Sequence, residues 1–150
     1  MSLTGIFTIS CIEGNLSLFV PADAGPDFPD SPLQCVLPDS EPPTFFRVNS
    51  RGADNYEIVS VKYPNIAICA IGDASPKLLR MMSKYQGGDN VYNQWEIGQV
   101  DSHEYVIHAF GGSGDDYWTL NEGPSRTIKL QELKGERSQT WRLLRVQEEE

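Results

Sequence analysis

The side chains best suited to chemistry are few and scattered. The sequence has two histidines, His103 and His108, and three cysteines, Cys11, Cys35 and Cys69. None of them has the paired spacing of zinc ligands, and no Gly-x-Ser-x-Gly turn supplies a serine nucleophile. Ser–His–Asp catalysis would need one of these histidines beside such a turn. The sequence therefore predicts no metal site, no cofactor and no enzymatic activity.

A glycine-rich segment at residues 111–116 is the next candidate. It superficially resembles a phosphate-binding loop, but it lacks the lysine of a P-loop, and no helix is predicted after it. Its two adjacent carboxylates, Asp115 and Asp116, are too few for a calcium cage. We interpret the segment as a hairpin loop.

An aromatic pair follows this loop. Tyr117 and Trp118 stand beside Asp115, Asp116 and Asn121, and we expect the two rings to be exposed. Carboxylate and amide groups can hydrogen-bond sugar hydroxyls, and an exposed ring can stack on a sugar. These five residues are the predicted carbohydrate platform.

The charge balance excludes several partners. The chain of 150 residues has a net charge of -9, whereas nucleic-acid and anionic membrane surfaces call for clustered Lys and Arg. No apolar run is long enough for membrane insertion, and no signal peptide is visible, so we expect a cytoplasmic protein. Three cysteines in apolar strand patterns indicate buried thiols rather than disulfides. The sequence does not indicate an oligomeric state.

Aromatic residues recur along the chain at a fixed spacing. By subtraction, three strand openers lie 49 positions apart, and three strand closers follow at spacings of 49 and 46. The openers are Phe7, Tyr56 and Tyr105, and the closers are Phe46, Trp95 and Trp141. A period of this size indicates structural repeats.

Each repeat contains four short strand patterns separated by turn residues. The twelve expected strands cover residues 5–10, 16–20, 33–37, 45–49, 56–62, 66–71, 78–83, 94–100, 105–110, 117–122, 128–133 and 141–146. Turn signals at this spacing are typical of all-β barrels and sandwiches. Three units of four strands predict a β-trefoil. We expect one domain, residues 1–150, with units at about 5–50, 55–100 and 104–147, and with the six aromatic rings in its core.

Residues Ser138-Gln139-Thr140-Trp141 resemble the Gln-x-Trp signature of ricin-B-type lectins, and Asn93-Gln94-Trp95 is a weaker copy. The resemblance covers the whole chain and implies a β-trefoil with a capacity for sugar binding. Sugar-binding members carry an Asp in the second strand of each unit. Here the aligned positions hold Ser17, Ala67 and Thr119, and the third strands have no aromatic residue. The usual pockets are therefore predicted to be lost. We interpret Gln139 as the cap of a core turn, with ligand contact as the alternative.

The start Thr4-Gly5-x-Phe7 and residues 37–48 also resemble the lectin-like light subunits of mushroom tyrosinases. This resemblance implies a non-catalytic recognition module that binds a protein partner, such as the oxidase tyrosinase, a carbohydrate, or both. Phe28 and Tyr85 are the predicted partner contacts, because they are apolar residues in loops.

The alternative is a fungal β-trefoil protease inhibitor, because those proteins share the same strand plan. Inhibitors of trypsin present a Lys or Arg on a loop. The loop at residues 21–32 contains three Asp and no basic residue, which leaves Lys77 and Arg126 as candidates.

Overall fold

The computed structural model describes residues 3–20, 33–37, 39–40, 44–52, 54–72, 77–83, 91–112, 114–121 and 126–147. Within these residues the chain forms strands and two short 3-10 turns, η1 (Glu13–Asn15) and η2 (Arg137–Gln139). The strands are β1 (Gly5–Cys11), β2 (Leu16–Phe19), β3 (Gln34–Val36), β4 (Phe46–Gly52), β5 (Asn55–Ser60), β6 (Ile66–Ile71), β7 (Arg80–Ser83), β8 (Val91–Tyr92), β9 (Trp95–Asp101), β10 (Glu104–Ala109), β11 (Tyr117–Leu120), β12 (Ile128–Gln131) and β13 (Trp141–Gln147).

The twelve expected strands all form, and the all-β prediction is confirmed. The described residues contain one further strand, β8, which was not predicted. It pairs Val91 with Ile71 and Tyr92 with Ala70 of β6. Two residues are too few to show the alternation of apolar and polar side chains by which a strand is recognised in a sequence.

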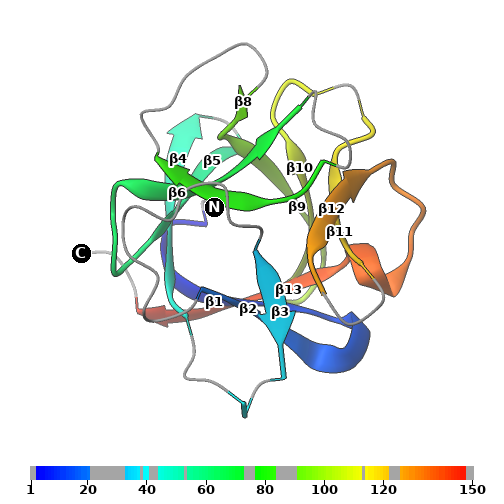
Figure 1. Ribbon diagram of the computed structural model, residues 1–150, viewed down its shortest axis with the longest axis horizontal. Helices are drawn as coiled ribbons and strands as arrows, with labels where there is room; N and C mark the ends of the chain where they lie inside the picture. Colours follow the sequence, from blue (N-terminus) through cyan, green and yellow to red (C-terminus); the bar gives the residue numbers. More distant parts are fainter. Residues whose placement is uncertain are drawn as a thin grey trace.

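Pairing of the first and last strands closes the barrel. Strand β1 runs antiparallel to β13, and Figure 1 shows the two side by side, blue beside red. The aromatic openers and closers pair as well: Phe7 with Phe46, Tyr56 with Trp95, and Tyr105 with Trp141. Each unit therefore joins its own two ends. Closure removes the unpaired edges that a flat sheet of these strands would expose.

The third strands of the three units meet over the barrel. The backbone N–H of Leu33 donates to the carbonyl of Leu79 over 2.9 Å, and the N–H of Leu79 donates to the carbonyl of Ile128 over 2.9 Å. Each residue comes from a different unit. These bonds join the three hairpins into one cap, related by an approximate threefold axis.

All six predicted core rings are buried, which confirms their assignment. The two indole N–H groups of the closers are also satisfied: Nε1 of Trp95 donates to the carbonyl of Ile68 (2.9 Å), and Nε1 of Trp141 donates to the carbonyl of Trp118 (3.0 Å). A buried indole normally requires such a partner. Phe46 has no N–H and needs none.

Strand register places Trp118 on the inside of the barrel. Leu18 pairs with Cys35, Ile68 with Met81, and Trp118 with Leu130, so these three pairs are equivalent. Trp118 is fully buried and makes edge-to-face contacts with Trp95 and Trp141. The prediction that Trp118 is an exposed part of a sugar platform is therefore wrong. A residue at the position of Leu18 and Ile68 points into the core.

The same register corrects the alignment of the lectin Asp position. Ser17 pairs with Ser10, Ala67 with Val59, and Tyr117 with His108. Tyr117, not Thr119, is therefore the third equivalent of Ser17 and Ala67. None of the three positions carries a carboxylate, so the conclusion drawn from the alignment is unchanged.

The second unit carries a small apolar cluster on the outer face of its strands. Val59, Ala67, Cys69 and Met82 are buried there, with Ile71 and Val91 packed against them. Val91 belongs to β8, so the unpredicted strand helps to cover this cluster. An outer barrel face that would ordinarily contact water is thereby buried in this unit.

Candidate binding cleft

Five adjacent strands of the barrel carry a continuous row of polar side chains on the outer face. Asn55 of β5 pairs with Glu96 of β9, Glu96 with His108 of β10, and His108 with Tyr117 of β11. Tyr117 in turn pairs with Gln131 of β12. Directly opposed residues of antiparallel strands point to the same side of the sheet. We call these five residues the Glu96 row.

His108 is the centre of the row. Its Nε2 lies 3.1 Å from Oε2 of Glu96, and its Nδ1 lies 3.8 Å from Oδ1 of Asp116. Its ring stacks on that of Tyr117, with 4.5 Å between centroids and 28° between planes. The ring is thus held by Tyr117 on one face and flanked by carboxylates at both nitrogens.

A cleft of about 660 Å³ opens beside the row. Glu96, His108 and Tyr117 line it, together with Gly98 and Val106. Gly98 pairs with Val106 across the β9–β10 hairpin, two residues from Glu96. Because Gly98 has no side chain, space remains on the outer face next to the carboxylate of Glu96.

Asp116 lies beneath this surface. It is fully buried, and neither carboxylate oxygen has a hydrogen-bond partner among the described residues. A Cβ atom on Gly112 would overlap Oδ2 of Asp116. The glycine at 112 is therefore required by the packing of Asp116, which gives the glycine-rich loop a structural reason unrelated to phosphate.

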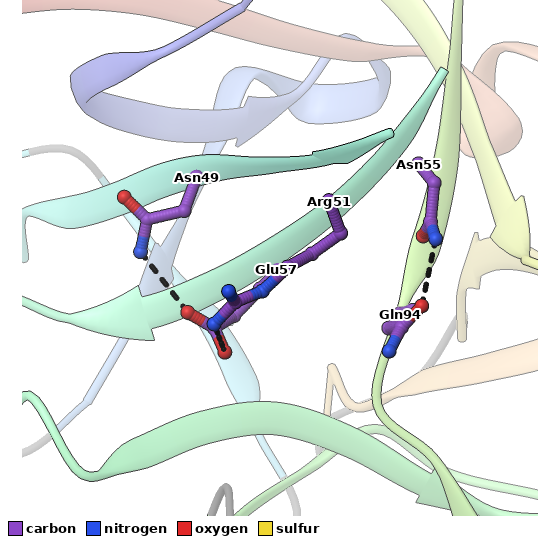
Figure 2. A network of polar contacts seen from close by, with 5 residues as sticks. All are labelled: Asn49, Arg51, Asn55, Glu57 and Gln94. Carbon is purple, nitrogen blue, oxygen red and sulfur yellow. Dashed lines mark hydrogen bonds and ion pairs between the residues drawn. The ribbon is translucent and has the colours of Figure 1, made fainter. Parts of the chain in front are cut away.

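A second polar group borders the other end of the row. Figure 2 shows Nδ2 of Asn55 donating to Oε1 of Gln94 over 2.7 Å. Beside it, Glu57 accepts from Asn49 over 3.0 Å and from Arg51 over 2.6 Å. Glu57 is satisfied by these partners, although it is almost buried. The Oδ1 atom of Asn55 is buried and has no hydrogen-bond partner among the described residues.

The structure separates the five residues of the predicted carbohydrate platform. Tyr117 and Asp116 lie beside His108, as described, whereas Trp118 points into the core. Asp115 is exposed and lies 3.5 Å from Nζ of Lys77. The side-chain amide of Asn121 donates to Oγ1 of Thr127 over 2.8 Å, which closes the β11–β12 hairpin. The adjacent carboxylates of Asp115 and Asp116 therefore face different surroundings.

The two basic residues of the inhibitor alternative are held close to the body of the protein. The side chain of Lys77 is 18% exposed and faces Asp115. The carbonyl of Arg126 accepts the N–H of Cys35 within the cap, and its φ is 48°. The backbone of Arg126 is thus fixed within the cap, and the side chain of Lys77 is largely covered. The predicted partner contacts, Phe28 and Tyr85, lie outside the described residues.

Gln139 has the structural role predicted for it. The residue is buried, and its Nε2 donates to the carbonyl of Glu132 (2.8 Å) and to Oγ1 of Thr119 (3.1 Å). Its Oε1 accepts the backbone N–H of Lys134 over 2.7 Å. These bonds tie the segment between β12 and β13 to the core and leave Gln139 no atom facing a ligand.

The three cysteines are buried and unpaired, as predicted. Burial raises the pKa of Cys11 to about 11 and that of Cys69 to about 12, and it also raises the pKa of Cys35. A thiolate, not a thiol, is the reactive form. These side chains are therefore poor nucleophiles at neutral pH.

Glu96 and His108 were not predicted to belong to one site: His108 was assessed as a metal ligand or catalytic base, and Glu96 was not a candidate. They are twelve positions apart by subtraction and meet only through the register of the β9–β10 hairpin. The signal was present in the strand pattern: Ile97 and Ile107 are both buried, so the alternate residues 96 and 108 point outward together.

Comparison with known proteins settles the architecture. The designed threefold-symmetric protein ThreeFoil aligns with 95% of this chain and 99% of its own, with a TM-score of 0.74 and 16% identity. The fold is a β-trefoil. A proteinase inhibitor from Coprinopsis cinerea aligns with 97% of the trefoil and 100% of its own chain (TM-score 0.71, 10% identity). The ricin B-like lectin of Macrolepiota procera, solved with lactose, aligns with 97% and 98% (TM-score 0.70, 14% identity).

At such identities these likenesses establish the fold alone. No protein-family profile matches the sequence, and no curated protein is similar to it. Within the described part of the chain, no helix is long and apolar enough to cross a membrane. In the same residues, no group of three or more His, Cys, Asp or Glu is placed to hold a metal ion.

Proposed function

We propose that this trefoil is a non-catalytic, lectin-like recognition module that binds a glycan in the cleft beside the Glu96 row. One observation carries the proposal: an aromatic ring, an imidazole and a carboxylate come together at an open cleft. Tyr117 and His108 supply ring surface, and Glu96 supplies an acceptor for sugar hydroxyls. The lactose-bound lectin of Macrolepiota procera supports the general role.

The surroundings of His108 support a role without catalysis. A catalytic pair of the Ser–His or Cys–His type would need a hydroxyl or thiol nucleophile within hydrogen-bond reach of the histidine. Among the described residues, His108 faces two carboxylates and a tyrosine ring, and no serine or threonine hydroxyl bonds to it. The buried thiols, with their raised pKa values, do not supply a nucleophile either.

A glycan array followed by calorimetric titration of the best hit tests this proposal. Tyr117→Ala is expected to weaken the affinity about fivefold, because an aromatic contact is worth about 1 kcal/mol. Ser17→Ala is the matched control, since Ser17 is the equivalent residue of the first unit. An array on which the wild-type protein binds no glycan would contradict the proposal. Equal losses in the two variants would place binding elsewhere on the protein.

The resemblance to tyrosinase light subunits adds a protein partner of the oxidase type to this proposal. Co-purification from the native cell, read by mass spectrometry, is its test. Recovery of a copper oxidase at constant stoichiometry is the expected result. A single uncomplexed chain at native concentration would remove the partner and leave the glycan proposal standing.

A further inference from the structure

The position of Asp116 is anomalous within the threefold pattern. Trp118 is equivalent to Leu18 and Ile68, so residue 116, two positions earlier, is equivalent to Leu16 and Ile66. Those two residues are buried apolar side chains, whereas the third unit buries a carboxylate. A buried carboxylate that accepts no hydrogen bond from the described residues is destabilising, and its presence indicates a role other than packing.

The row has more acceptors than donors. A neutral imidazole has a single N–H, so neutral His108 can donate to Glu96 or to Asp116 but not to both. The buried atoms bordering the row that lack partners in the described residues are oxygens: both of Asp116 and Oδ1 of Asn55. The indole N–H of Trp118 also lacks a partner among these residues, but its ring packs against Trp95 and Trp141 in the core, whereas Oδ1 of Asp116 lies 3.8 Å from Nδ1 of His108.

The charged residues at the cleft also favour a ligand that donates hydrogen bonds and carries positive charge. Asp54 and Glu96 line the cleft, with Asp116 beneath, and the arginine that lines it is Arg145. Arg145 also lies over the ring of Phe7, 5.2 Å from its centroid. The contrast with the other units is direct. In the third unit the residue opposite His108 is the acidic Glu96. In the other units the residues equivalent to His108 are Val59 and Ser10, and they lie opposite the basic residues Arg47 and Arg142.

We propose that the cleft recognises a sugar carrying a protonated amine, a 2-amino-2-deoxy sugar of the glucosamine type. This inference rests on the proposed function and names its ligand class. An ammonium group brings three donors and no acceptor, which matches a cleft lined by the carboxylates of Asp54 and Glu96. It pairs with the carboxylate of Glu96, and the ring of Tyr117 attracts a cation at its face. N-acetylation of the amine removes both interactions.

Calorimetric titration of the full chain with two matched tetrasaccharides is the test. The probes are the β-1,4-linked tetramer of glucosamine and the same tetramer fully N-acetylated. We expect the free amine form to bind at least about tenfold more tightly, with an affinity that falls as salt rises. Glu96→Gln is expected to abolish the preference. Glu132→Gln is the matched control, because it removes the same charge from an exposed position outside the cleft.

The acidity of the whole chain requires a further arm, because any polycation could associate with it. Tetralysine with both ends blocked carries four ammonium groups without a sugar ring and is titrated in parallel. Equal binding of tetralysine and tetraglucosamine would overturn the inference in favour of a basic peptide or of general charge attraction. An equal effect of Glu132→Gln and Glu96→Gln would overturn it as well.

The outcomes separate the inference from the function on which it rests. If the N-acetylated tetramer or lactose binds as tightly as tetraglucosamine, and Tyr117→Ala weakens that binding, the amine preference is wrong and the glycan cleft stands. If no saccharide on the array or in the titration binds, the proposed function itself fails.

Discussion

The outer faces of the second and third units use equivalent positions for opposite purposes. Val59, Ala67 and Met82 of the second unit are buried in an apolar cluster beneath β8. Their equivalents in the third unit, His108, Tyr117 and Gln131, belong to the Glu96 row beside the cleft. The inner faces carry apolar rings in both units. Threefold packing therefore constrains the side of each strand that faces the core, and it leaves the other side free to differ.

The largest expected difference in stability between the two outer faces is at Met82 and Gln131, which occupy equivalent positions in the second and third units. Met82 is fully buried, so Met82→Ala is expected to lower the free energy of unfolding by about 2–5 kcal/mol. Gln131→Ala is expected to change it by less than about 0.5 kcal/mol, because Gln131 is not buried. Urea unfolding of both variants measures the difference. Similar losses would show that the two outer faces are packed alike.

The next largest expected change in stability is at Asp116, where the substitution is expected to stabilise the protein. Asp116→Asn removes a buried charge at nearly constant shape, and we expect it to raise the free energy of unfolding at pH 7 by about 1–3 kcal/mol. The urea midpoint at an unchanged slope is the readout. A lower midpoint in the variant would mean that His108 already compensates the carboxylate in the folded protein.

A smaller expected difference between the two units is in how the free energy of unfolding depends on pH. Cys69 and Thr119 are equivalent, since they pair with Arg80 and Lys129. Burial raises the pKa of Cys69 from 9.0 to about 12, so the unfolded chain loses this proton at a lower pH than the folded protein. Stability is therefore lost as the pH rises from about 9 towards 12. Between pH 8 and 10 the expected loss from this thiol is about 1.4 kcal/mol.

Cys69→Thr places the residue of the third unit in the second and is expected to remove that loss. Unfolding in urea at pH 8 and pH 10 is compared for the variant and the wild type. The comparison uses the change between the two pH values, so any constant cost of the threonine hydroxyl cancels. Parallel declines in the two proteins would mean that Cys69 does not titrate differently on unfolding.

The sequence was sufficient for the architecture, because the features that specify it are local or periodic. Aromatic openers and closers such as Tyr56 and Trp95 mark the ends of the units, and Gly, Pro and Asn mark the turns. Each of these signals can be read within a few residues. Their agreement across three repeats made the β-trefoil a secure prediction, and the pairing of openers with closers confirmed it.

The candidate site was only partly predictable, because it depends on register between distant strands. Tyr117 and Asp116 were identified from their neighbours in the sequence, but Trp118 was assigned to the wrong face. The strand flanks were aligned two residues out of step, since Asp116 breaks the apolar pattern that Leu16 and Ile66 follow. Asn55 and Glu96 are 41 positions apart by subtraction, and nothing in the local sequence of either points to the other.

The contact of Trp118 with Trp95 and Trp141 has an optical consequence. The sequence contains three tryptophans, and all three are fully buried within this one chain of edge-to-face rings. Their emission therefore arises from the barrel interior, shielded from dissolved quenchers, and excitation can migrate among the three indoles. Loss of the core will shift and unmask this fluorescence, whereas a ligand that occupies the outer surface does not touch the emitting rings. The protein thus contains an intrinsic reporter of its own folding that is insulated from what it binds.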